Sequence, residues 1–117
     1  MTTPEERLNE RRNKKPLSMT DIAAQSITRA AIAGVVGVGR TVNGAKTLRV
    51  ERNTSGATYV AHAEDEAGTV IWIDERLDWT MTAMLTAADV KWFPTVGVTP
   101  VEGDLPEGVE AVFTITL

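Results

Sequence analysis

The sequence predicts a mainly β fold, a small β-sandwich or partly open barrel of five to seven antiparallel strands, preceded by an N-terminal helical arm. Two observations predict it. Short segments rich in β-branched residues recur between turn residues over 35–117, whereas helix-start signals occur at Thr3 and Ser18 and apolar residues over 22–31 have helical spacing. A chain of 117 residues has room for one domain with one core.

Residues 1–17 form the predicted arm. Thr3 followed by a proline is a typical helix start, and Pro16 ends the segment. Since Leu8 is the one large apolar residue between these prolines, such a helix is marginal in water and orders only against a partner surface. A disordered terminus is the other interpretation. If the arm does dock, the predicted interface residues are Arg7, Leu8, Arg11 and Arg12.

Residues 18–117 form a single predicted domain. Its helix, at about 20–33, begins at a cap made by Ser18 and Asp21 and stops at Gly34. The apolar face of this helix is mostly alanine, which permits close approach to a sheet or to another helix. The pattern favours core packing, and an interface helix is the alternative.

A β meander follows the predicted helix. The pair Asn43-Gly44 predicts a hairpin turn between strands at 38–42 and 45–52, because both turn positions need positive φ. Further strands are predicted at 57–63 and 69–74, and the second of these is the most apolar. Glycine-containing turns separate the successive strands.

Residues 79–88 fit two structures. Met81 and Leu85 have helical spacing, whereas the alternating threonines favour a strand, which is the interpretation we prefer. Prolines and glycines then predict a long loop at 94–108. Residues 109–117 alternate in side-chain type and predict the last strand.

Composition excludes several classes of protein. The chain has no cysteine, so it has no disulfide, thiolate nucleophile or cysteine-zinc site. Its first twenty residues are charged and lack the apolar region of a secretory signal. The longest apolar run, 30–39, is shorter than the ~20 residues that a membrane-spanning helix needs. We therefore expect no membrane partner.

Charge is unevenly distributed along the chain. Residues 1–40 carry a net charge of +3 and residues 41–117 a net charge of −7. Acidic residues interrupt the basic ones in the arm, which weakens attraction to phosphates, so nucleic acid is not an expected partner. The pattern favours an arm that docks on a neighbouring protein.

The sequence predicts no catalytic residue, no cofactor and no metal site. His62 is the one histidine and lies in a predicted strand, where we interpret it as structural. The acidic turns lack the ligand spacing of a calcium loop. Gly34, Gly37 and Gly39 lack the spacing of nucleotide-binding loops, so we interpret them as a helix stop and bulges.

Trp92 and Phe93 precede Pro94 in a predicted loop. Aromatic residues in such places either close a core or anchor an interface. Both remain open at this point, and we include the pair among the interface candidates.

Three segments resemble small bacteriophage virion proteins of the head, neck or tail: DWTMTAML at 78–85, FPTVG at 93–97 and VEAVFTITL at 109–117. The resemblance implies a mechanical role without enzyme activity, self-association, contact with other virion proteins, and a place in a virion assembled in the bacterial cytoplasm. The N-terminal arm is longer than this resemblance leads one to expect. The alternative is a soluble acidic binding protein of the immunity or inhibitor type, whose body masks a basic site on its partner.

Overall fold

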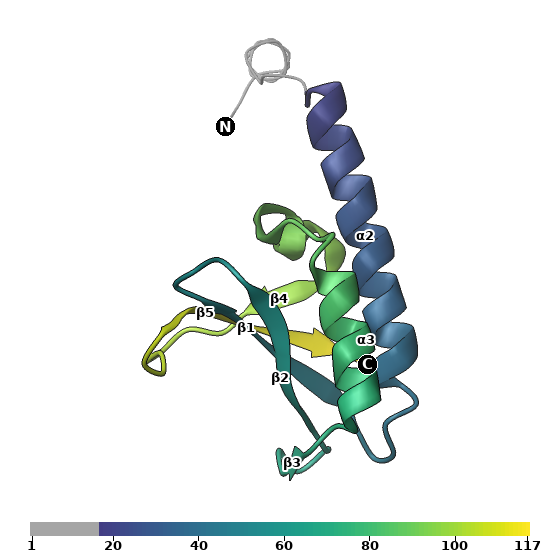
Figure 1. Cartoon of the computed structure of the whole chain (residues 1–117), viewed down its shortest axis with the longest axis vertical. Coiled ribbons are helices and arrows are strands. Elements are labelled where there is room, and N and C mark those ends of the chain that lie inside the picture. Colours follow the sequence, from purple (N-terminus) through teal and green to yellow (C-terminus); the bar gives the residue numbers. More distant parts are fainter. Residues whose placement is uncertain (1–16) are drawn as a thin grey trace, which may run out of the picture.

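The computed structural model describes residues 17–117, so the arm residues Arg7, Leu8, Arg11 and Arg12 lie outside the described residues. Three helices and five strands alternate in groups along this part of the chain (Figure 1). They are helix α2 (Met19–Gly39), strands β1 (Thr47–Asn53), β2 (Thr58–Glu64) and β3 (Val70–Ile71), helix α3 (Glu75–Leu85), the 3-10 helix η1 (Val90–Val96), and strands β4 (Val98–Pro100) and β5 (Val109–Thr116).

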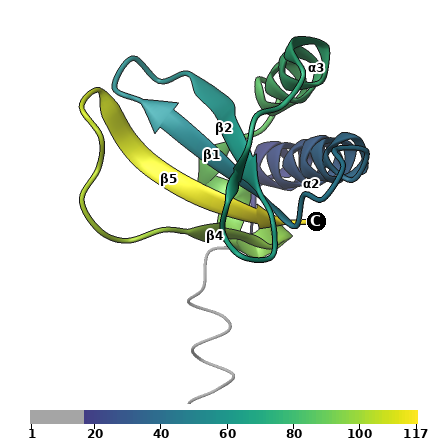
Figure 2. The same ribbon diagram turned by 90° about the horizontal axis from the view of Figure 1, so that it is seen from below.

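The five strands form one antiparallel sheet in the order β3-β2-β1-β5-β4. β1 lies at its centre, with Leu48 opposite Ala63 of β2 and Ile115 of β5. Both edges are short, and the β4 edge ends at Pro100, which lacks the N–H that would pair with a further strand. Figure 2 shows α2 and α3 on the same side of this sheet.

The core lies between the sheet and the helices. Alternate residues of β1 point toward the helices, and Leu48 and Val50 are completely buried there. Phe93 of η1 is also completely buried and contacts the ring of Phe113 edge-on, with 4.9 Å between the centroids. The remaining buried members are Ile32, Val35, Val60, Ala63, Met81, Leu85, Val98 and Ile115.

The expected antiparallel sheet is present, with five strands, but it is a single open sheet. Helices make up 39% of the described residues and strands 27%, so the expectation of a mainly β fold is not confirmed. No second sheet and no closed barrel occur within residues 17–117. The helices cover the face that a second sheet would cover in a sandwich.

Helix α2 is longer than predicted and continues through Gly34 and Gly37 to Gly39. Gly34 and Gly39 are sites of close packing, whereas nothing lies within 4 Å of a Cβ atom on Gly37. A Cβ atom on Gly39 would lie 2.7 Å from Cδ2 of Leu117 and 3.0 Å from Cδ1 of Leu48, closer than packed atoms approach. The predicted strand at 38–42 is therefore wrong. Gly44 does adopt the positive φ of a turn, at 81°, but the turn connects a helix to β1.

The interpretation of residues 79–88 as a strand is also wrong. Asp74 caps α3 by accepting a hydrogen bond from the backbone N–H of Arg76, and Met81 and Leu85, four residues apart, are both buried. Thr80 tolerates the helix because its hydroxyl donates to the Arg76 carbonyl. Burial of one helical face outweighs the strand preference of threonine.

The other strand predictions differ in outcome. β1, β2 and β5 match the segments predicted at 45–52, 57–63 and 109–117 to within a few residues. The strand predicted at 69–74 is reduced to the two residues of β3. Trp72 follows it with 80% of its surface exposed, because the chain leaves the sheet there to begin α3.

Candidate assembly surfaces

The first candidate surface is the N-terminal part of α2 with the residue pair before it, residues 17–27, which we call the projecting half. Figure 1 shows this part of α2 extending beyond α3 and the sheet. The buried residues of α2 all lie from Thr28 onward. The projecting half instead exposes large apolar side chains, with exposed fractions of 50% for Leu17, 81% for Met19, 46% for Ile22 and 52% for Ile27.

A complete capping box holds the start of the projecting half in helical form. The Ser18 hydroxyl oxygen accepts from the Asp21 N–H at 3.0 Å, and the Asp21 carboxylate accepts from the Ser18 N–H at 3.4 Å. These bonds satisfy backbone donors that a helix start otherwise leaves to water. The projecting half thus has a defined shape although little of the fold packs against it.

The exposed side of α2 carries a shallow hollow of about 500 Å³. Small side chains form its floor, so another helix can approach closely. Ile22 borders it on the N-terminal side, and Arg29 supplies its one charge. The lining residues are Ile22, Gln25, Ser26, Arg29, Ala30 and Ala33.

The second candidate surface is an open groove of about 740 Å³ along α3, which we call the α3 groove. Trp79 forms one wall and is 77% exposed, which is unusual for so large an apolar ring. A smaller hollow of about 220 Å³ shares Trp79 and Ala83 with this groove and is also lined by Thr82 and Thr86. The groove is lined by Glu75, Arg76, Trp79, Thr80, Ala83 and Met84.

Acidic side chains surround the first turn of α3. Asp74, Glu75 and Asp78 lie there, where the helix dipole favours negative charge. Partial burial raises the pKa of Asp78, and the charge of Glu75 adds to this, while a hydrogen bond from Thr82 acts in the opposite direction. The start of α3 is therefore acidic, and of these three acids Glu75 lines the α3 groove, next to Arg76.

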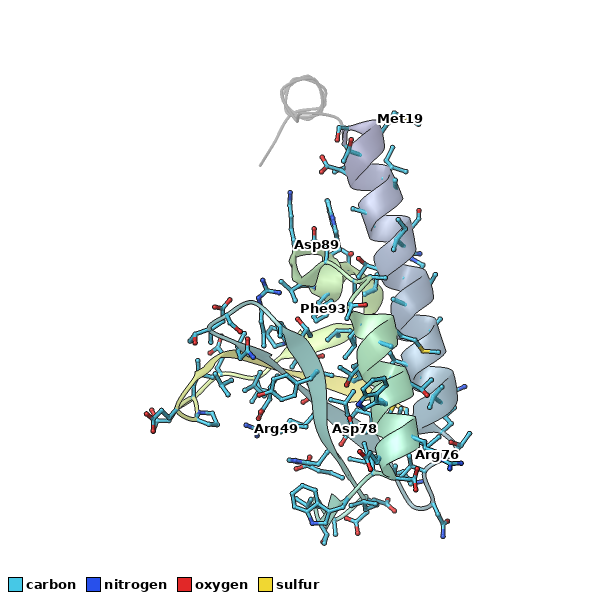
Figure 3. The ribbon with its side chains drawn as sticks, in the orientation of Figure 1. Met19, Arg49, Arg76, Asp78, Asp89 and Phe93 are labelled. Carbon is cyan, nitrogen blue, oxygen red and sulfur yellow. The ribbon has the colours of Figure 1, made fainter. Side chains whose placement is uncertain are left out.

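The face of the sheet that the helices leave uncovered has polar side chains. The Arg49 Nε donates to Glu51 at 2.8 Å, and the Tyr59 hydroxyl donates to the other oxygen of Glu51 at 3.1 Å. Partial burial, this hydrogen bond and the charge of Glu51 raise the pKa of Tyr59. Figure 3 shows Arg49 on the part of the sheet away from α2. Arg49, Glu51 and Tyr59 thus provide hydrogen-bond partners for one another.

His62 lies on the same face of the sheet. Its Nε2 is 3.4 Å from the Glu64 carboxylate, and its ring meets Trp72 edge-on at 6.1 Å between centroids. These contacts give His62 a structural environment. Among residues 17–117, no group of three or more histidine or acidic side chains is arranged to hold a metal ion.

The structure separates the two aromatic interface candidates. Phe93 is completely buried against Phe113. It is therefore a core residue and is unavailable for a contact with another subunit. Trp92 is half-buried, with the Lys91 ammonium 5.0 Å from the centre of its ring. A contact through Trp92 stays a prediction.

Helix α2 is long and apolar enough to cross a bilayer, judged by length and composition. It has 21 residues and a mean hydropathy of 1.4 over its most apolar stretch, of which 22% is buried in the fold. Mostly buried core helices and signal sequences near the N-terminus satisfy the same criterion, and α2 lies near the N-terminus. In α2, Ile32 and Val35 pack into the core beneath the sheet, and the charged Arg29 lies near the helix centre, where a bilayer makes it costly.

The described residues define a class of architecture, an open antiparallel sheet with helices on one face, with exposed apolar side chains on α2 and α3. Comparisons with known protein families, curated proteins and solved structures found no match for this chain. The surfaces themselves must therefore carry the functional conclusion.

Sequence reasoning kept an interface helix at 20–33 as an alternative, but it did not identify Met19, Ile22, Ile27 or Trp79 as exposed. One signal was available for α2, because Ile22, Ile27 and Ile32 do not share one face of a helix. A helix with apolar residues on several sides has more apolar surface than one sheet can cover. For Trp79 the alternating threonines concealed the helix, and with it the exposed side of the ring.

Proposed function

We propose that this chain is a non-enzymatic structural subunit that assembles with copies of itself. The observation that supports it is the projecting half of α2, where a capped, well-defined helix holds Met19, Ile22 and Ile27 in solvent. Exposing such side chains on a monomer is unfavourable by about 25 cal/mol for each Å² of apolar surface. Contact with another subunit removes this cost.

The setting we propose is a bacteriophage virion, in its capsid, neck or tail. The support is the resemblance of the segments at 78–85, 93–97 and 109–117 to small virion proteins. A virion subunit needs defined surfaces for neighbours and needs no catalytic centre. The proposed partners are further copies of the chain and other virion proteins.

Solution mass measured by light scattering over a concentration series tests self-assembly. We expect the full-length protein to form oligomers, and a variant with Ile22→Ser and Ile27→Ser to have a lower mass at the same concentration. The control is Thr99→Ser on the exposed face of β4, which changes no apolar contact. A wild-type protein that stays monomeric at every concentration contradicts the proposal.

Removal of residues 1–17 tests the role of the basic arm in assembly. These residues carry five basic side chains and a net charge of +2. We expect the remaining domain to stay folded, with a cooperative thermal unfolding transition, and to associate more weakly. Unchanged assembly would show that the arm has no part in it.

The second candidate is a soluble acidic protein that masks a basic site on a partner. The supporting observation is the loop between β4 and β5, where Glu102, Asp104 and Glu107 are all exposed. Complementary charge speeds such binding and makes it sensitive to salt. Salt-sensitive one-to-one binding by a stable monomer would favour this candidate over self-assembly.

A further inference from the structure

We infer that the α3 groove receives the projecting half of α2 from a second copy of the chain. This inference rests on the proposed self-assembly and specifies its contact. The chain has a helix that exposes apolar side chains and a groove with an exposed aromatic wall. The helix supplies apolar side chains that need cover, and the groove supplies an apolar surface that can cover them.

The occupant of the groove must come from another molecule. Figure 3 places Met19 at one end of the molecule and Arg76, in the groove, near the opposite end. α2 is a continuous helix from Met19 to Gly39 and α3 packs along its later part, at Gly34 and Met84. The projecting half therefore points away from the groove of its own chain.

The two surfaces match in shape. Trp79 lines both the α3 groove and the smaller hollow and is 77% exposed, so its ring can enter a depression on another helix. The hollow on α2 has a floor of small side chains, Ser26, Ala30 and Ala33, with Ile22 beside it. Packing of helices requires such alternation, in which the side chains of one helix enter depressions on the other.

The charges also match. At the start of α3, Glu75 and Arg76 line the groove, so Glu75 is its one negative charge. The hollow on α2 carries Arg29, which follows the projecting half in the same helix and has the charge opposite to that of Glu75. Opposite charges at the edge of an apolar contact favour this pairing over α2 against α2, which brings two Arg29 side chains together.

Cysteine cross-linking tests the contact directly, because the chain has no cysteine of its own. Ser26→Cys and Ala83→Cys place one thiol at the centre of each surface. Mild oxidation of a mixture of the two variants should give a disulfide-linked dimer containing both. Thr99→Cys, on the uncovered sheet face, is the control and should not cross-link with Ser26→Cys. Dimers of Ser26→Cys with itself, and none with Ala83→Cys, would overturn the inference.

Mixing of two assembly-deficient variants provides a second test. Ala83→Arg blocks the groove, while Ile22→Ser with Ile27→Ser disables the projecting half, and all three positions are exposed or half-exposed. Each variant alone should associate roughly tenfold more weakly or worse. The mixture should recover a one-to-one complex, because each variant keeps the surface that the other has lost. Thr99→Arg controls for the added charge and should leave the mass unchanged.

The outcomes separate the inference from the proposed function. A wild-type protein that is monomeric defeats the proposed self-assembly and the groove contact together. An oligomeric wild type whose mass neither variant changes defeats the groove contact alone. Loss of assembly in both variants without recovery on mixing also defeats it, since it indicates one surface that pairs with itself.

Discussion

The two halves of α2 are parts of one helix with different environments. From Thr28 onward its inward residues are buried, with exposed fractions of 0% for Thr28, 5% for Ile32 and 0% for Val35. The projecting half leaves Ile22 and Ile27 about half exposed. The buried half of α2 therefore contributes to the stability of the fold, and the projecting half is available for assembly. A substitution in one half can change stability without changing assembly, or assembly without changing stability.

The sharpest test of this comparison applies one substitution to both halves. Ile32→Ala should lower the free energy of unfolding by about 2–5 kcal/mol, because it leaves a cavity between α2 and the sheet. Ile22→Ala should change it by less than about 0.5 kcal/mol, since this side chain is exposed. Urea unfolding measures both values. Similar losses in the two variants would mean that the projecting half is packed within the monomer.

A buried hydroxyl marks the point where the two halves meet. Thr28 Oγ1 donates to the Ala24 carbonyl at 2.8 Å and accepts from the Asp89 N–H at 2.9 Å, which ties α2 to the start of η1. Thr28→Val should cost about 1–3 kcal/mol, because the Asp89 N–H loses its acceptor.

Thr80→Val is the matched control for this substitution. Its hydroxyl also donates to the carbonyl four residues earlier, at 2.8 Å, but it is exposed and holds no second segment. Urea unfolding should show a small change for this variant. An equal loss at Thr28 and Thr80 would show that the bond to Asp89 contributes nothing.

Two glycines in the later part of α2 test whether the effect of a Gly→Ala substitution on stability depends on the atoms around the added methyl group. Gly39→Ala should destabilise the fold by about 1–3 kcal/mol, because the new methyl group would overlap Leu117 and Leu48. Gly37→Ala should stabilise it by about 0.5–1 kcal/mol, because nothing lies within 4 Å of the added atom and alanine favours the helix. Thermal unfolding distinguishes the signs, and the same sign for both would contradict the packing described here.

An element of this fold can be predicted when its pattern lies within its own segment of the sequence. It cannot be predicted when it depends on contacts with distant segments. Alternation identified β5, because strand periodicity is present in the segment itself. The end of α2 could not be predicted, since Gly39 packs closely against Leu48 and against Leu117, far along the chain, and no local pattern reports these contacts. The same holds for α3, where burial of Met81 and Leu85 against other elements overrides the threonine pattern.

The candidate surfaces were harder to predict than the strands. Ile22 and Ile32 are identical in type and lie on the same helix, and only the position of the sheet decides which of them is buried. Phe93 lies in a segment rich in proline and glycine and still fills the core. The exposure of a side chain depends on which distant segments pack against it in the folded chain, so it is difficult to predict from a single sequence.

A substitution on the uncovered face of the sheet should have the smallest effect on stability. It also serves as a control for the substitutions in the two halves of α2. Tyr59→Phe removes the hydrogen bond to Glu51, which lies far from both halves of α2 on the other side of the sheet, and should cost about 0.5 kcal/mol. The pKa of Tyr59 is raised above 10.0 by partial burial first, so the folded state favours the protonated phenol.

This direction fixes the pH dependence of the Tyr59→Phe effect. The stabilisation by Tyr59 is complete below the pKa of the unfolded chain and is lost as the pH rises through the higher pKa of the folded state. The difference between wild type and Tyr59→Phe in urea unfolding should therefore stay constant up to about pH 9 and shrink above pH 10. Light scattering at neutral pH should give both proteins the same mass, because the substitution touches neither the projecting half nor the α3 groove. A lower mass for Tyr59→Phe would mean that assembly responds to any loss of stability, and the two halves of α2 would then no longer have separate roles.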